Sequence, residues 1–203
     1  MNNFDNAAST WDENPMHLER SQAIAKKMQD LLSLRKDMNA LEYGAGTGIL
    51  SFLLSEKLGH ITMMDSSSGM VKVMEEKVQN RNATNLLPVC FNLELESSEQ
   101  EYQLIFNQMV LHHIKNVKSI FEKFNQMLSP DGILAIADLY LEDGSFHGDG
   151  FDGHMGFDPG KLEAMLLAAG FKNINHEQCY SVKRKLDDGT VKSFPIFLLT
   201  ASK

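Results

Sequence analysis

The sequence predicts an α/β fold in which helices cover both faces of an open, mostly parallel sheet. Short apolar runs alternate with segments in which apolar residues recur at helical spacing, over most of the 203 residues. Residues 133–139 are apolar except for Asp138, as expected of a strand that is covered on both faces. Because such alternation builds strand–helix–strand units, the strands should run parallel with right-handed crossovers.

The parallel strands are expected where short apolar runs end at a turn. In chain order these runs are residues 40–43, 60–65, 86–91, 102–109 and 133–139. The last of them follows the turn Ser129-Pro130-Asp131-Gly132, whose residue types favour a chain reversal.

The helices are expected between these strands, and capping residues mark several of their ends. Asn14-Pro15 and Asp158-Pro159 each provide an N-cap followed by a proline at the first helical position. Gly59 and Gly170 are expected to end two of the helices. The predicted helices start at residue 15, cover 49–58, 70–78 and 120–128, and start again at residue 159.

The C-terminal part departs from the alternation. Residues 171–186 and 191–201 are two strand-like runs joined by Asp-Asp-Gly-Thr at 187–190, which is typical of a hairpin. An antiparallel hairpin is therefore expected at the edge of the sheet. A chain of 203 residues can fill one core, so residues 1–203 should form one domain that begins with a helical segment, residues 1–34.

Composition narrows the function classes. The formal net charge is −8, and an acidic surface repels phosphate backbones, so no nucleic acid partner is expected. No signal peptide and no apolar stretch of membrane-spanning length is visible, so no membrane association is expected. Cys90 and Cys179 are far apart and lie beside apolar residues, which favours reduced thiols in a cytoplasmic protein.

A glycine-rich turn follows the first strand. Gly44, Gly46 and Gly48 form a G-x-G-x-G pattern directly after the apolar run. Glycine lets the backbone approach a ligand closely and adopt dihedrals that a Cβ would disfavour. In an open α/β sheet, ligands bind beyond the carboxyl ends of the strands. Such a turn alone is a weak signal, but two carboxylates near it sharpen the prediction.

The two carboxylates are Asp65 and Glu42. Asp65 ends the second strand, 21 residues after Gly44, where an acid can accept hydrogen bonds from both hydroxyls of a ribose. The dinucleotide fingerprint would place a third glycine at position 49, which is Ile49. Glu42 would repel a pyrophosphate but suits a ligand that carries a cationic amine and a sulfonium. A nicotinamide oxidoreductase is therefore a disfavoured alternative.

At these residues the chain resembles the class I S-adenosylmethionine-dependent methyltransferases, over nearly its whole length. The matching segments are 42–48 (first motif), Asp65 (ribose-binding acid), 91–94 (after the third strand), 108–114 (fourth motif), 128–134 (approach to the fifth strand) and 168–171 (end of the last helix). The resemblance implies a Rossmann-like, doubly wound sheet of seven strands with a C-terminal antiparallel hairpin. It also implies S-adenosyl-L-methionine as the cofactor.

The resemblance assigns cofactor contacts to ten residues at the ends of the first four strands. They are Glu42, Gly44, Ala45, Gly46, Gly48, Asp65, Ser66, Asn92, Leu93 and Gln108. Many members carry Asp where this chain has Asn92, the position that faces the adenine amine.

The acceptor is expected beside the fourth and fifth strands. Gln108, Met109 and Tyr140 follow or end these strands and should line its pocket, together with Trp11 and Arg20. The N-terminal segment, with Phe4, Trp11, Met16 and Arg20, resembles the family's lid over the cofactor. The alternative is an amphipathic helix that only packs on the sheet.

Histidines are the candidates for proton transfer, and we name His113 and His154. The Leu-His-His sequence recurs in family members with different acceptors, so His112 or His113 should be structural. His147 and His154, with Asp149, Asp152 and Asp158, could form a metal site. Loop histidines seven residues apart have no established ligand spacing, so no metal is expected.

The segment after the fourth strand also excludes a substrate class. It lacks the Asn/Asp-Pro-Pro-aromatic arrangement of enzymes that methylate DNA bases or protein glutamine. Together with the acidic charge, this indicates a small-molecule methyl acceptor for a monomer or homodimer, with oxygen, carbon, sulfur and nitrogen all open as the methylated atom. The alternative from another class is a regulatory protein that binds S-adenosylmethionine and transfers nothing.

Overall fold

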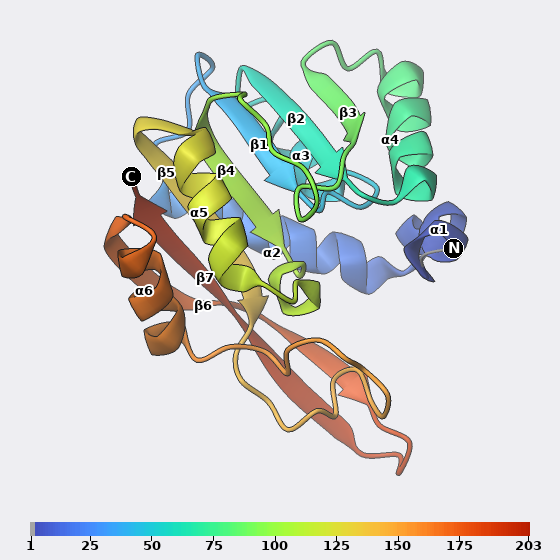
Figure 1. Cartoon of the computed structure of the whole chain (residues 1–203). Coiled ribbons are helices and arrows are strands. Elements are labelled where there is room, and N and C mark those ends of the chain that lie inside the picture. Colours follow the sequence, from blue (N-terminus) through green and yellow to red (C-terminus); the bar gives the residue numbers. More distant parts are fainter. Residues whose placement is uncertain (1–2) are drawn as a thin grey trace.

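The computed structural model describes residues 3–203, and these residues form a mixed seven-stranded sheet with helices on both faces (Figure 1). The strands are β1 (Asn39–Tyr43), β2 (His60–Asp65), β3 (Leu86–Cys90), β4 (Tyr102–Gln108), β5 (Leu128–Leu139), β6 (Lys172–Lys185) and β7 (Val191–Ser202). Their order in the sheet is β3-β2-β1-β4-β5-β7-β6. The first five run parallel, and β7 runs antiparallel to both β5 and β6. The predicted parallel sheet and its C-terminal antiparallel hairpin are confirmed.

Eight helical segments connect these strands or precede them. They are α1 (Asn3–Ala7), η1 (Ala8–Glu13), α2 (Pro15–Leu31), α3 (Ile49–Leu54), α4 (Ser68–Arg81), η2 (Leu111–His113), α5 (Val117–Met127) and α6 (Pro159–Ala168). The side chains of Asn14 and Asp158 cap α2 and α6, as predicted. The helix α3 ends at Leu54, earlier than expected, because Ser55 Oγ donates to the Phe52 carbonyl and competes with continued helix.

Two hydrophobic cores lie on opposite faces of the sheet. On one face, α2, α3 and α4 contribute Ile24, Leu50 and Met74 to a buried cluster. On the other face, α5 and α6 contribute Phe121 and Leu162 to a second cluster. Burial of each such side chain stabilises the fold by roughly 1.5–3 kcal/mol. Covering both faces leaves the carboxyl edge of the parallel strands as the place for a site.

The N-terminal elements α1, η1 and α2 lie along this carboxyl edge, toward which the arrowheads of β1, β2 and β4 point (Figure 1). Asp5 Oδ1 accepts hydrogen bonds from Ser67 Oγ (2.6 Å) and Gly69 N (2.9 Å) where α4 begins. Asp12 Oδ2 lies 2.7 Å from Lys77 Nζ of α4. The segment before β1 is therefore attached to α4 through two acidic side chains.

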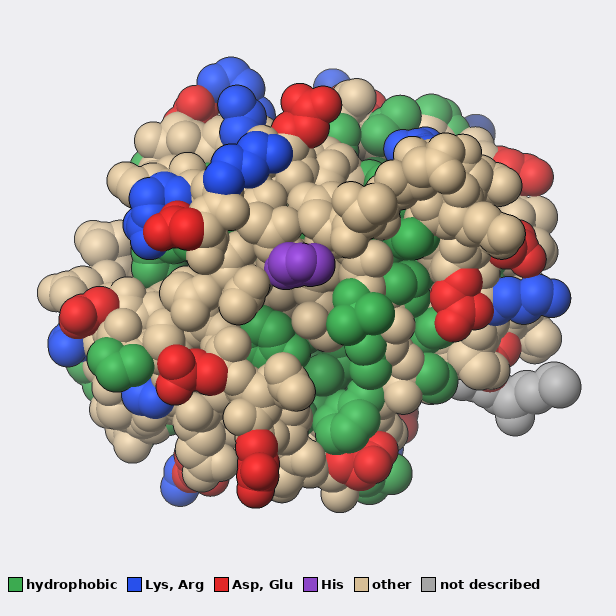
Figure 2. Space-filling model, turned by 90° about the horizontal axis from the view of Figure 1, so that it is seen from above, with side chains coloured by type: hydrophobic (Ala, Val, Ile, Leu, Met, Phe, Trp, Pro, Cys, Tyr) green, Lys and Arg blue, Asp and Glu red, His purple; other side chains and the backbone are tan. Residues whose placement is uncertain are grey.

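The opposite edge of the sheet, where the parallel strands begin, carries side chains of both charges. Seen from there, basic and acidic side chains are scattered over the surface and no large field of one sign stands out (Figure 2). Within residues 3–203, no helix has the length and the apolar character needed to cross a membrane. Cys90 and Cys179 are both free, as expected of reduced thiols.

Candidate active site

The turn between β1 and α3 holds three glycines in the left-handed region, at φ 68° for Gly44, 58° for Gly46 and 79° for Gly48. Their surroundings differ. A Cβ on Gly44 would lie 2.5 Å from the Val110 side chain, and one on Gly48 would lie 2.9 Å from Met63 Sδ. A Cβ on Gly46 would meet no atom within 4 Å. Gly46 therefore faces open space at the turn, whereas Gly44 and Gly48 are needed for packing.

Asp65 lies beside this turn at the end of β2. Its Oδ2 accepts a hydrogen bond from Gly46 N (2.7 Å), and its Oδ1 accepts one from Ser67 N (2.8 Å). Burial raises the pKa of the Asp65 carboxyl, and the bonds from these backbone N–H groups oppose that rise. Each carboxylate oxygen has a second lone pair, so Asp65 keeps capacity to accept hydrogen bonds from a ligand.

A cavity of about 780 Å³ opens along the carboxyl edge. This volume lies within the range of about 300–1,000 Å³ that is usual for small-molecule and cofactor sites. Most of the site residues predicted from the sequence line it: Trp11, Arg20, Gly44, Ala45, Gly46, Asp65, Ser66, Asn92, Leu93, Gln108, Met109 and His113. The bare Cα of Gly46 and the carboxylate of Asp65 fit S-adenosylmethionine, because a nucleoside needs close backbone approach and an acceptor for its hydroxyls.

Glu42 and Gly48 are absent from the cavity wall, so the structure does not place either of them against the space for the cofactor. Glu42 is fully buried beneath the turn and accepts hydrogen bonds from Ser51 N (3.0 Å) and from Ser51 Oγ. Burial raises the pKa of Glu42 to about 8. The acid therefore ties β1 to α3 from below the turn.

Tyr140 and His154 also lie outside the cavity wall. The Tyr140 ring packs against Phe197, with ring centroids 5.3 Å apart. His154 Nε2 is 3.0 Å from the carbonyl oxygen of Ile114. The pocket prediction for Tyr140 and the catalytic prediction for His154 are not supported by this geometry, because both rings are engaged in packing elsewhere.

Arg20 presents a buried cation to the cavity. Its Nε is buried and has no hydrogen-bond partner among the described residues. Burial lowers the pKa of Arg20 to about 10, and the charge of Asp138 opposes that change. Gln108 is held in place, since its amide atoms lie 2.9 and 3.0 Å from Ser21 Oγ of α2. The helix α2 thus supplies a charge to the cavity and fixes a neighbouring side chain.

Three histidines gather where β4 and β5 end. His112 Nδ1 lies 2.6 Å from Asp138 Oδ1, and both residues are buried, which fits the structural role expected of one histidine in this pair. His113 and His147 line the cavity next to it. Burial lowers the pKa of His113 and of His147 to about 4, helped by His112 and His147 in the first case and by His112 and Arg184 in the second. His147 approaches this pair, whereas the sequence had grouped His147 with His154.

Sequence reasoning missed part of the cavity wall. Phe146, Val182 and Arg184 line it, together with the neighbours Lys183 and Lys185 of β6. The basic run at 183–185 was visible in the sequence, but a solvated strand face was the simpler interpretation. The signal that could have found it is topological, because loops beyond the carboxyl ends of neighbouring strands meet at one edge.

Residues 16–176 match the family described as methyltransferase domain. Among curated proteins, the chain is 27% identical over 156 residues to an uncharacterized methyltransferase of Schizosaccharomyces pombe, covering 68% of this chain and 55% of that protein. It is 28% identical over 151 residues to malonyl-[acyl-carrier protein] O-methyltransferase 2 of Ilyobacter polytropus, covering 69% of this chain and 55% of that protein. The chain thus spans about half the length of these curated relatives.

Solved structures share the fold at low sequence identity. The DhpI–SAH complex has a TM-score of 0.74 at 17% identity and covers 98% of this chain and 92% of that one. The YcgJ protein of Bacillus subtilis has a TM-score of 0.70 at 15% identity, over 91% and 98% of the two chains. Together with the family match over most of the chain, this confirms the predicted recognition: the chain belongs to the methyltransferase domain family and has the class I S-adenosylmethionine-dependent methyltransferase fold.

Proposed function

We propose that this chain transfers the methyl group of S-adenosylmethionine to a small-molecule acceptor. The observation that carries the proposal is a single cavity whose wall holds Gly46 and Asp65 as well as Arg20 and His113. The first pair fits a nucleoside, and the second pair fits a polar acceptor. One shared cavity for two ligands is what a transfer reaction needs, because orientation of the two reactants provides much of the rate.

The residues of the cofactor end would bind and orient. Bound S-adenosylmethionine would supply a methyl group on a sulfonium, which an acceptor displaces in line. Asp65 would accept hydrogen bonds from the ribose hydroxyls, and Asn92 and Leu93 would lie along the adenine. Glu42 would hold the turn from below through Ser51. In this assignment the buried Glu42 shapes the turn, and Asp65, which lines the cavity, holds the ligand.

The residues of the acceptor end favour an acceptor with an acidic or electron-rich group. Arg20 is a buried guanidinium whose Nε lacks a partner, and an anionic ligand would complete its hydrogen bonds. The names of two relatives point to oxygen-bearing organic acceptors, malonyl-[acyl-carrier protein] and demethylmenaquinone. His113 offers an uncharged imidazole to the same space.

The test measures S-adenosylhomocysteine formation with a panel of paired acceptors, each acid being matched by its neutral amide or ether. We expect turnover with at least one acidic member. We expect Arg20→Met to lower kcat/KM for that member about 10- to 100-fold, the scale of one charge-assisted hydrogen bond, while the cofactor Kd changes less than twofold. Cofactor binding with no product from any acceptor would favour the regulatory alternative.

We also propose that the protein works in the cytoplasm, as a monomer or homodimer, without nucleic acid. The net charge of −8 and the two free cysteines support this setting. Residues 1–34 would serve as a lid on a single methyltransferase domain. The support for the lid is that Phe4, Trp11 and Met16 line the cavity.

A further inference from the structure

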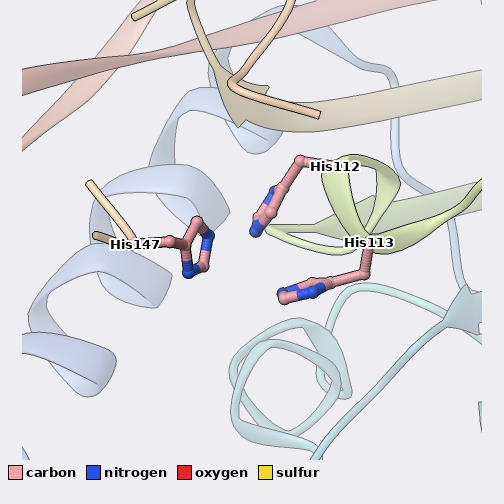
Figure 3. Close-up of side chains that lie close together, drawn as sticks. All are labelled: His112, His113 and His147. Atoms are coloured by element: carbon pink, nitrogen blue, oxygen red, sulfur yellow. The ribbon is translucent and has the colours of Figure 1, made fainter. Parts of the chain in front are cut away.

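We propose that His112, His113 and His147 bind one divalent transition-metal ion of the zinc type inside the cavity. One ring nitrogen from each histidine can be chosen so that all three lie within 4.8 Å of one another. Two of the imidazoles come from η2, and the third comes from the loop after β5; all three converge on a common space (Figure 3). Imidazole nitrogen is the commonest protein ligand for such ions.

The first ligand is held in place by a carboxylate. His112 is 1% exposed, and its Nδ1 lies 2.6 Å from Asp138 Oδ1, so Nε2 is the nitrogen left for an ion. Asp138 is itself fixed, because it accepts hydrogen bonds from His112 N (3.2 Å) and Leu139 N (2.7 Å). A carboxylate behind a histidine fixes the tautomer and orients the ring, as it does at many zinc sites.

The third proposed ligand is His147. His147 Nε2 is buried and has no hydrogen-bond partner among the described residues. A buried polar atom without a partner costs free energy, and a coordinated ion would remove that cost. Phe151 stacks on the His147 ring at 3.8 Å between centroids, and Phe4 packs edge-on against His113 at 5.3 Å. These aromatic neighbours therefore restrict the rings of His147 and His113 around the space between the three histidines.

The ligand types select the ion. Three neutral imidazoles suit zinc, copper, iron or nickel, whereas magnesium and calcium prefer carboxylate and carbonyl oxygen. Nitrogen atoms at about 2.0–2.1 Å from zinc lie roughly 3.3 Å apart in a tetrahedron, so nitrogen–nitrogen separations of up to 4.8 Å would shorten by about 1.5 Å at most. Three protein ligands leave a fourth position open, as catalytic zinc sites do.

The role of the ion rests on the proposed function. An acceptor oxygen or sulfur at the open position would lose its proton to solvent at neutral pH, because a bound cation lowers its pKa. A lone pair of that atom would then form the bond to the methyl carbon. The carbon–sulfur electron pair would stay on sulfur and give S-adenosylhomocysteine. The acceptor class would thereby narrow to small molecules with an ionisable hydroxyl, carboxyl or thiol group.

Zinc binding is tested without cofactor or acceptor. The protein, produced without a polyhistidine tag and stripped with a chelator, is titrated with zinc chloride by calorimetry, and cobalt(II) absorption reports the ligands. We expect one ion per chain, and at least a tenfold weaker Kd in His147→Ala and in His113→Ala. Both residues are only partly buried, so the variants should fold, which thermal melting verifies. His176→Ala, at an exposed histidine on β6, is the matched control.

Equal zinc affinity in the wild type and in His147→Ala would overturn the site, as would equal losses in His147→Ala and His176→Ala. Calorimetry with S-adenosylmethionine on the same samples separates this result from the proposed function. Cofactor binding and methyl transfer without zinc binding would remove only the metal site. Zinc binding with no methyl transfer to any acceptor would leave the site in place and remove the proposed function.

Discussion

The two ends of the cavity are built in different ways. At the cofactor end, Gly46 and Asp65 belong to one strand–helix–strand unit and are joined by a hydrogen bond from Gly46 N to the Asp65 carboxylate. At the acceptor end, Arg20, His113 and His147 come from α2, η2 and the loop after β5. Backbone groups and a missing Cβ shape the first end, whereas side chains from distant segments shape the second. The fold therefore dictates the cofactor end, and substitutions can change the acceptor end without changing the fold.

The largest effect is expected at the bare Cα of Gly46. In Gly46→Val the side chain would enter the cavity, so cofactor affinity should fall more than 100-fold, measured by calorimetry. The control is Gly189→Val in the β6–β7 turn, where φ is +83° and an added Cβ also meets no atom within 4 Å. Both variants carry the strain of a left-handed valine, about 1–2 kcal/mol, but only the first should lose the ligand. Cofactor binding by a folded Gly46→Val protein would show that the turn does not contact it.

The buried acid below the turn should make stability depend on pH. The folded-state pKa of Glu42 is raised to about 8, so the folded carboxyl stays protonated while the unfolded one, with a pKa of 4.5, ionises. Unfolding then releases a proton, and this contribution to stability is lost as the pH rises from 4.5 through 8. Relative to Glu42→Gln, the wild type should lose roughly 3 kcal/mol between pH 4.5 and 7.

Chemical denaturation of both proteins across this range measures the difference. Glu76→Gln, at an exposed acid on α4, should follow the wild type. Parallel pH profiles for Glu42→Gln and wild type would mean that Glu42 is ionised in the folded protein, and its proposed support of the turn would then be that of a charge.

Removal of the carboxylate that faces the ligand should have a smaller effect than filling the site. Asp65→Ala should weaken cofactor binding by about 1.5–3 kcal/mol, the scale of a charge-assisted hydrogen bond. Calorimetry measures this change, and Asp37→Ala, on the exposed loop before β1, is the control. Wild-type affinity in a folded Asp65→Ala protein would contradict the ribose assignment and weaken the contrast between the two ends.

The proposed lid, residues 1–34, should give the smallest effect. Trp11 is the single tryptophan, lines the cavity and stacks on His17 at 4.3 Å. S-adenosylhomocysteine should therefore change its emission and protect the first 20 or so residues from proteolysis. Asp12→Ala removes the contact with Lys77. It should lower the free energy needed to open the N-terminal segment by roughly 1 kcal/mol, so cleavage without ligand should be faster.

The matched control for the lid is Asp30→Ala, which removes an exposed ion pair with Lys26 on α2. Its cleavage should match that of the wild type. Unchanged emission and unchanged cleavage at saturating S-adenosylhomocysteine would identify the segment as a fixed part of the wall, which is the packing alternative considered from the sequence.

The local sequence determined the order of strands and helices and the residues at the cofactor end of the cavity. Apolar periodicity marked the strands and helices, the Asn14-Pro15 and Asp158-Pro159 caps marked helix starts, and the turn at 187–190 marked the hairpin. Gly46 and Asp65 were predictable because a glycine turn and an acid at neighbouring strand ends are brought together by any parallel sheet of this kind.

Only the tertiary structure decided which of the remaining side chains point into the cavity and which pack elsewhere. Glu42 lies below the turn, Tyr140 and His154 make contacts outside the cavity, and His147 lies beside His112 and His113. Side chains alternate between the faces of a strand, so a shift of one residue moves a group from the cavity to the core. The path of the loop after β5 depends on contacts with β7 and η2, such as the bonds from Tyr140 N to Pro195 O and from His154 N to His112 O. Such contacts join residues far apart in sequence, so no local pattern records them.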